Sequence, residues 1–375
     1  MIEVILKLGG LQAFFLGVVL LKRNPRTISN KLLAVLILAL GLSCFFYSFN
    51  NLDFYLNYPH LIRIDWGIPL LFGPLIYLYT LSLTNSSKKW SNNHYVHFIP
   101  YLANLVILAP FFLGSSEDKI QVLDYFTAAI TNGTDHYYYY NFILRIAISI
   151  IGLSYSIASI NLVKTYTDNL LNEYSDIQKI KLDWLRLLLF YYLFLSIIFI
   201  VISFLIFGDR YLQLDYNVYY FILVFVLIYA LSYKALSHPQ IVALSLVDKK
   251  DHITPKSTTK LKPSSNKSHF INRYMEESKP FLNGELTASM LADDLHISRH
   301  QLSEVLNEEI GNNFYDFINL YRIEEFKSRV QLPENDHLTL LAIALDSGFN
   351  SKTSFNTVFK KSTGKTPSQF RKGLK

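Results

Sequence analysis

Two short polar stretches near the C-terminal end of the 375-residue chain combine small hydrogen-bonding side chains with cations. Small polar side chains at the start of a helix can reach base edges in the major groove of DNA, while lysine and arginine bind phosphates. The candidate DNA contacts are therefore Arg299, His300, Gln301 and Ser303 in the first stretch, and Ser351, Lys352, Thr353, Asn356, Thr357, Lys360 and Lys361 in the second.

A helix–turn–helix unit is expected to position each stretch. In the first unit, Ser298 and Gln301 have the spacing of a capping box, which predicts that the second helix begins there. In the second unit, Gly348 supplies the turn, and Asn350 or Ser351 caps the following helix. Apolar stripes at helical spacing precede both turns, and they consist of Leu286, Met290, Leu291 and Leu295 in the first unit and of Leu341, Ala344 and Leu345 in the second.

The two units repeat one pattern. Segment 305–317, VLNEEIGNNFYDF, aligns with segment 358–370, VFKKSTGKTPSQF. This self-similarity indicates that one supersecondary unit is used twice. A helix near 314–330 is expected to join the two copies rigidly. Helical pairs joined by tight turns also occur in ordinary helical bundles. The distribution of charge is therefore needed to distinguish a DNA-binding domain from such a bundle.

Charge separates the two units. Residues 338–375 contain seven lysines and arginines against one acid, Asp346, whereas residues 285–335 contain four against ten acids. A basic surface is the electrostatic property that DNA binding requires. The second unit is therefore expected to dominate the contact with DNA, and the acidic first unit is expected to bind the backbone weakly.

These residues resemble the AraC/XylS-type transcription regulators over about 270–375. The resemblance rests on a first stretch that includes LADDLHISRHQLSEVLNEEIG and on a second, IALDSGFNSKTSFNTVFKKSTGKTPSQFRK. It implies two helix–turn–helix units on one linking helix, which enter successive major grooves. Ser354 and Thr357 stand where many members carry Tyr and Arg, a difference that bears on base preference.

The first 240 residues have a different composition, because long apolar runs follow one another there. A helix needs about 20 apolar residues to cross a bilayer. We expect seven spans, near 2–21, 32–49, 67–84, 96–114, 141–163, 184–207 and 218–237. With the N-terminus outside, the inner loops carry nine lysines and arginines and the outer loops three, which predicts a cytoplasmic C-terminus. This half also resembles, more weakly, the seven-span region of membrane-bound AraC-like regulators of Bacteroidetes-type bacteria, around GPLIYLYTLSL and HFIPYL.

Ionisable residues in or beside the spans are the candidates for ligand binding. Arg63, Asp65 and Arg145 qualify if they face the interior of the bundle, although side chains near a span end can also reach water. Tyrosines crowd the span ends, where they form an aromatic belt or line a ligand pocket. No cluster has metal-ligand spacing, and no nucleophile–base pair or phosphate loop is evident, so we expect no cofactor, no metal and no catalysis.

The chain is therefore expected to be all-α, with a seven-helix transmembrane bundle (1–240), a flexible cytoplasmic linker (241–268) and a DNA-binding domain (269–375). A flexible linker cannot pass the rotation of a helix to the DNA-binding domain. It can bring two DNA-binding domains close together when the bundles associate, which raises their effective concentration at a shared operator. The sequence predicts a membrane-anchored one-component regulator in the bacterial inner membrane. Its expected partners are double-stranded promoter DNA, the lipid bilayer, RNA polymerase, a second copy of the chain and an unknown small ligand or membrane signal. The alternatives are a receptor or transporter whose tail docks a protein, and a bundle that only anchors.

Overall fold

The computed structural model is helical throughout its described residues, which are 2–23, 27–49, 52–85, 91–121, 136–208, 217–237 and 267–374. Its only extended pairing among these residues is a single antiparallel bridge between Tyr174 and Thr287. The expected all-α class is confirmed for this part of the chain. Two compact units are present: residues 1–163 with 183–251, and residues 164–182 with 252–375. The expected linker at 241–268 lies outside the described residues except for Lys267 and Ser268.

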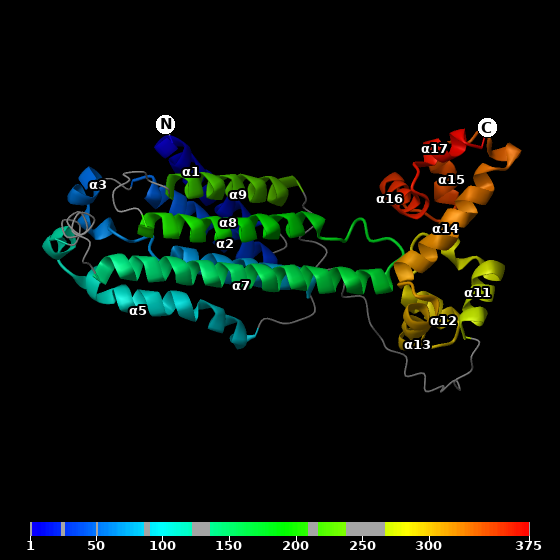
Figure 1. Ribbon diagram of the computed structural model, residues 1–375, viewed down its shortest axis with the longest axis horizontal. Helices are drawn as coiled ribbons and strands as arrows, with labels where there is room; N and C mark the ends of the chain where they lie inside the picture. The colour runs from blue at the N-terminus through cyan, green and yellow to red at the C-terminus, as the bar shows by residue number, and fades with distance from the viewer. Residues whose placement is uncertain are drawn as a thin grey trace. The chain divides into compact units, whose positions relative to one another are not determined.

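The first unit is built from apolar helices that lie side by side (Figure 1). Six helical stretches within the described residues are long and apolar enough to cross a membrane. Its helices are α1 (Ile2–Lys22), α2 (Ile28–Tyr47), α3 (Leu52–Asn57), η1 (Pro59–Leu61), η2 (Ile68–Leu71), α4 (Phe72–Thr84), η3 (Asn92–Phe98), α5 (Ile99–Leu113), α7 (His136–Glu173), α8 (Asp183–Gly208) and α9 (Asn217–Ser237). The last ten residues of α7, from position 164, belong to the second unit.

The third expected span is shorter than the others. The stretch from Ile68 to Thr84 begins as the 3₁₀ turn η2, and its regular α-helix starts only at Phe72. Pro69 and Pro74 fall in this region, and proline provides no backbone N–H for a helical hydrogen bond. The side chains of α4 are largely buried inside the unit. Among the described residues, length and composition therefore identify six candidate spans and one short buried helix.

Small residues allow the first two helices to pack closely. A methyl group placed on Gly10 of α1 would collide with Phe45 and the Gly41 carbonyl of α2, and one placed on Gly41 would collide with Ala13. Small residues at such contacts are typical of helix pairs in membranes, where backbones approach closely. The pairing buries most of α2, which lies in the interior of the unit.

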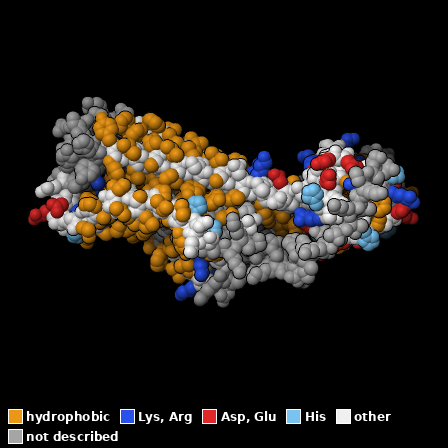
Figure 2. All heavy atoms as spheres, turned by 90° about the horizontal axis from the view of Figure 1, so that it is seen from below, with side chains coloured by type: hydrophobic (Ala, Val, Ile, Leu, Met, Phe, Trp, Pro, Cys, Tyr) orange, Lys and Arg blue, Asp and Glu red, His pale blue; other side chains and the backbone are white. Residues whose placement is uncertain are grey.

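The outer surface of the first unit is apolar. Figure 2 shows hydrophobic side chains covering the visible face of this unit, and the exposed fractions of individual residues are high, as for Val106 (73%) and Leu187 (71%). Soluble monomers rarely expose continuous apolar patches of this kind. The surface is compatible with helices surrounded by lipid.

The second unit is a compact helical domain with two apolar cores. Its helices are α11 (Lys267–Ser278), η5 (Pro280–Leu282), α12 (Ala288–Asp294), α13 (Arg299–Glu304), the π-helical turn η6 (Val305–Ile310), α14 (Phe314–Val330), η7 (Pro333–Asn335), α15 (Leu340–Asp346), α16 (Lys352–Thr363) and α17 (Pro367–Lys372). Helix α14 contributes Phe317 and Ile318 to the first core and Ile323 and Phe326 to the second. Both helical pairs therefore pack against the same helix.

Candidate DNA-binding surface

The first helix–turn–helix unit consists of α12, a turn at 295–298, and α13. The Ser298 side chain accepts a hydrogen bond from the Gln301 backbone N–H at 3.2 Å, and the Gln301 side-chain oxygen accepts from the Ser298 backbone N–H at 2.9 Å. This reciprocal pair is the capping box that the sequence predicts. Helix α13 then continues as the π-helical turn η6 and ends at Gly311, which has a positive φ.

The four candidate contacts of the first unit have different surroundings. Arg299 and His300 are exposed at the start of α13. The Gln301 side-chain oxygen is already used by the capping box, and Ser303 accepts a hydrogen bond from the Asn307 amide at 3.1 Å. Arg299 forms an ion pair with Glu173, the last residue of α7, at 2.5 Å. Arg299 and His300 are thus the most exposed of the four, and Arg299 already has an anionic partner.

The second unit consists of α15, a turn at Gly348, and α16. Ser351 caps α16 by accepting from the Ser354 backbone N–H at 3.1 Å, which decides between the two expected caps. Asn350 instead donates its amide to the Gly284 carbonyl at 2.7 Å. Gly348 has a φ of +94°, and a methyl group there would collide with the Phe281 carbonyl.

Helix α16 has a clean division between its buried and exposed faces. Phe355, Val358 and Phe359 belong to the second core. The opposite face exposes Lys352, Thr353, Asn356, Thr357 and Lys360, whose positions follow helical spacing. Five of the candidate contacts are thereby brought onto one surface.

The surroundings of Lys361, of Ser354 and of the apolar residues of α15 differ. Lys361 is exposed and pairs with Asp316 of α14 at 2.7 Å. Only 1% of the surface of Ser354 is accessible, because it lies on the side of α16 that faces Tyr315 of α14. In α15 the buried residues are Ile343 and Ala344, whereas Leu341 and Leu345 are exposed. The expected stripe was therefore displaced around this short helix, which has too few turns for the pattern to fix its buried face.

A buried arginine lies on α14, where the two helix–turn–helix units meet. Arg322 of α14 is fully buried and donates to the carbonyls of Phe281 (2.8 Å), Asn283 (2.8 Å) and Ser175 (3.2 Å). It also donates to the Ser175 hydroxyl at 3.0 Å. Burial lowers the pKa of Arg322 to about 10, so the guanidinium remains charged at neutral pH. Its fork of donors thus ties α14 to the η5 turn and to the segment that follows α7.

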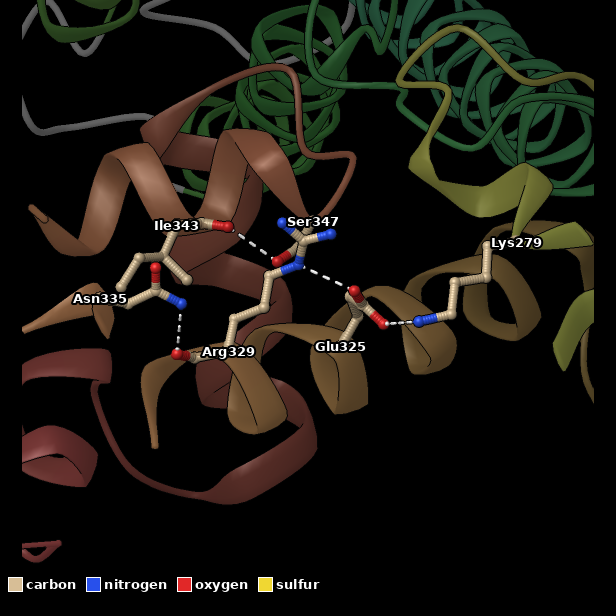
Figure 3. A network of polar contacts seen from close by, with 6 residues as sticks. All are labelled: Lys279, Glu325, Arg329, Asn335, Ile343 and Ser347. Atoms are coloured by element: carbon tan, nitrogen blue, oxygen red, sulfur yellow. Dashed lines mark hydrogen bonds and ion pairs between the residues drawn. The ribbon is translucent and has the colours of Figure 1, made fainter. Parts of the chain in front are cut away.

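A second polar network runs along the outer side of α14 (Figure 3). Glu325 accepts from Lys279 and from Arg329, each at 2.8 Å, and Asn335 donates to the Arg329 carbonyl at 2.9 Å. Although burial alone would raise the pKa of Glu325, the hydrogen bonds from Lys279 and Arg329 lower it. Through Glu325 and Arg329 in the C-terminal half of α14, the network connects Lys279, which precedes η5, with Asn335 in η7.

Residues 164–182 are an unforeseen part of this domain, because the sequence places them in a loop between two spans. Leu170 and Ile177 lie in the second core. Ser175 is buried, donates to the Leu286 carbonyl at 2.7 Å, and accepts from Asn319 at 3.0 Å through its carbonyl. Backbone acceptors exist in every residue, so no sequence pattern could have identified these contacts.

The three candidate ligand residues among the apolar helices have different surroundings. Arg63 is buried in the turn before η2 and lies over the rings of Trp66 and Phe111, at 4.2 and 4.9 Å. Asp65 lies in the same turn and is partly buried. Arg145 of α7 donates to Ser203 of α8 at 3.0 Å and therefore faces another helix. Among the described residues, no group of three His, Cys, Asp or Glu side chains could hold a metal ion.

Comparison with known proteins agrees with this geometry. A family model described as a helix-turn-helix domain matches residues 291–373. An uncharacterized HTH-type transcriptional regulator of Staphylococcus aureus strain COL is 34% identical over 101 residues, which are 27% of this chain and 13% of that protein. A counterpart from strain MSSA476 has the same identity and coverage.

The likeness covers only a part of each relative, since the chain spans about 13% of the length of these regulators. A solved structure of a protein of unknown function from Listeria innocua is 29% identical over 28% of this chain and 93% of that chain, with a TM-score of 0.25. The family model and the relatives together show that the chain carries an AraC-type helix–turn–helix domain at its C-terminal end, and the described residues before this domain include six helices apolar and long enough to cross a membrane.

Proposed function

We propose that this protein is a membrane-anchored one-component transcription regulator that binds promoter DNA through its C-terminal domain. The observation that carries the proposal is α16. This capped helix buries one face in the domain core and presents Lys352, Asn356 and Lys360 on the other. Around it the second unit is basic. Such a helix can place small polar side chains against base edges and lysines against phosphates.

Within this proposal the candidate contacts have separate roles. Lys352, Thr353, Asn356 and Thr357 lie in the first two turns of α16 and read bases, with Ser351 holding the helix start. Lys360 and Lys361 lie in its last turn and grip the backbone. Arg299, His300, Gln301 and Ser303 form the smaller contact of the first unit. RNA polymerase and a second copy of the chain are further partners of a regulator of this kind.

The membrane location is supported by the apolar outer surface and by the connectivity of the chain. Segment 164–182 and the C-terminal domain form one compact unit, so both must lie on the same side of a membrane. Two candidate spans, α8 and α9, separate them in sequence, and two crossings return the chain to the same side. DNA binding requires that side to be the cytoplasm. The bundle then either senses a signal, through residues such as Arg63, Asp65 and Arg145, or only anchors the domain.

DNA binding is tested with the full chain in lipid nanodiscs. Selection from a random duplex library should recover a preferred site, and affinity for it should fall as salt is raised. Lys360→Ala should weaken binding, while Lys327→Ala, which removes a lysine from α14, is the matched control. Failure to bind any duplex at low salt would contradict the proposal and favour a tail that docks a protein.

Membrane topology is tested with reporter fusions. Fusions after Lys89, after Lys179 and after Lys267 should report the cytoplasm, and a fusion after Lys119 should report the periplasm. The fusions after Lys179 and Lys267 must agree whatever the number of earlier spans. A periplasmic signal after Lys89 would mean that α4 does not cross the membrane.

A further inference from the structure

We propose that segment 164–182 is a docked control arm of the DNA-binding domain, through which Glu173 restrains Arg299 of the first recognition helix. The inference rests on the proposed function and adds a route of regulation to it. The arm comprises the last ten residues of α7 and the loop that leads to α8. It is distinct from the segment at 241–268, which is the other connection between the apolar helices and the domain.

The arm contacts both helix–turn–helix units. On the side of the first unit, Tyr174 forms a bridge with Thr287, and Ser175 bonds the Leu286 carbonyl. On the side of the second unit, Leu170 and Ile177 share a core with residues of α15 and α16. An element that packs on two units at once fixes their relative placement.

Burial makes the arm a lasting part of the domain. Ser175 has an exposed fraction of 1% and supplies two acceptors to the guanidinium of Arg322. Removing these acceptors would leave a buried charge with fewer partners, which is strongly unfavourable. The arm therefore stays docked while the domain is folded, and any control must act through smaller movements at its ends.

Glu173 is the group at the arm's end that can act on DNA binding. One carboxylate oxygen accepts from Ser289 of α12 at 2.9 Å, and the other lies 2.5 Å from the Arg299 guanidinium. The carboxylate thus occupies the place beside the Arg299 guanidinium that a DNA phosphate would occupy. A negative charge at the C-terminal end of a helix is also unfavourable for the helix itself, so helix stability does not account for a glutamate here.

The negative charge of Glu173 should weaken the binding of DNA. To contact a phosphate, Arg299 must leave Glu173, and the carboxylate then repels the DNA. A shift of the last turn of α7 would move Glu173 and release Arg299 without undocking Ser175. Because α7 is a single helix from His136 to Glu173, a change within its apolar part has a direct path to this contact.

A double-mutant cycle in the full chain tests the restraint. With the duplex recovered by selection, Glu173→Gln should raise affinity about fivefold at low salt, the scale of a partly exposed ion pair. In an Arg299→Gln background the same change should give a clearly smaller gain, because no arginine is released and only the repulsion between the carboxylate and the DNA is removed. Asp168→Asn removes one exposed carboxylate from the same arm and is the matched control. An equal gain in both backgrounds, or no gain, would overturn the restraint.

A cross-link tests whether the arm remains docked. In a Cys44→Ala chain, Tyr174→Cys and Thr287→Cys would stand opposite each other on the antiparallel bridge, a separation that a disulfide can span. The oxidised protein should form the cross-link in high yield and bind DNA within about twofold of the reduced protein. A low yield, or loss of binding on oxidation, would overturn the docked arm. If the reduced parent binds no duplex, the proposed function fails instead, and the yield still decides the docking.

Discussion

The two helix–turn–helix units share a plan and differ in how their second helices meet solvent. Helix α16 runs for twelve residues and exposes one polar face. Helix α13 has six residues before it widens into a π-helical turn, and its first cation is paired with Glu173. A repeated scaffold therefore does not present the same polar groups to solvent twice. Packing is conserved between the copies, whereas the groups available for DNA are concentrated in one.

Replacing the buried Arg322 should have the largest effect on the stability of the domain, because both helix–turn–helix units pack on the helix that it anchors. Arg322→Leu would leave the Phe281 carbonyl without a donor and would remove one of the two donors from the carbonyls of Asn283 and Ser175. We expect a loss of about 3–5 kcal/mol in the stability of the domain, from these buried acceptors and from the lost packing of the side chain. Hydrogen exchange of α14 amides in the full chain measures this loss. Arg273→Leu, in an exposed pair with Glu277, is the control. Equal losses in both variants would show that the two units do not share this centre.

Base preference should depend on the second unit more than on the first. Lys352→Ala should cost about 1–3 kcal/mol on the preferred site and relax the preference at one base step. Arg299→Ala should cost less than 1 kcal/mol, since the free protein already pairs this side chain with Glu173. Binding to a set of single-base variants measures both. A larger loss for Arg299→Ala would reverse the assignment of roles.

The two neighbouring lysines of α16 offer a finer comparison. Lys360→Ala should lower the slope of log affinity against log salt by about one, as expected for the loss of one phosphate contact. Lys361→Ala should lower it less, because Lys361 is paired with Asp316 before DNA arrives. Asp316→Asn should then make Lys361 behave like Lys360. Identical slopes for the two alanine variants would remove this distinction.

The smallest effect concerns the pH dependence of the network on α14. Since the pKa of Glu325 is lowered in the folded domain, the stabilisation is present above its ordinary pKa of 4.5 and is lost as the pH falls through the lowered value. Glu325→Gln should therefore make the domain less sensitive to acid over that range. Thermal unfolding at pH 7 and pH 3.5 measures the difference. An unchanged acid response would mean that Glu325 does not contribute.

Local features of the domain could be predicted from the sequence, and distant ones could not. The capping box at Ser298 and the positive φ at Gly348 depend on residues within a few positions, so a local sequence pattern is enough to predict them. The docking of segment 164–182 depends on Ser175 meeting Asn319 and Arg322, which are 144 and 147 positions away. A serine in a loop between spans gives no sign of such a partner.

The candidate site shows the same division between local and distant causes. The exposed face of α16 follows from helical spacing, which places five of the candidate contacts on it. The ion pair that occupies Arg299 does not, because Glu173 comes from another helix. In α15, seven residues were too few for the spacing to separate Ile343 from Leu345.

The glycine at position 348 has a consequence for how such a domain can diverge. Its φ of +94° is unfavourable for residues other than glycine, and the nearby Phe281 carbonyl leaves no room for a Cβ atom. Random mutagenesis should therefore recover almost no functional substitution there, while Lys352, Thr353 and Asn356 on the outward face of α16 accept many. Because Gly348 lies in the turn before α16 and the variable positions lie on the exposed face of that helix, a descendant of this gene could acquire a new operator sequence by changing the helix surface while the turn stays the same.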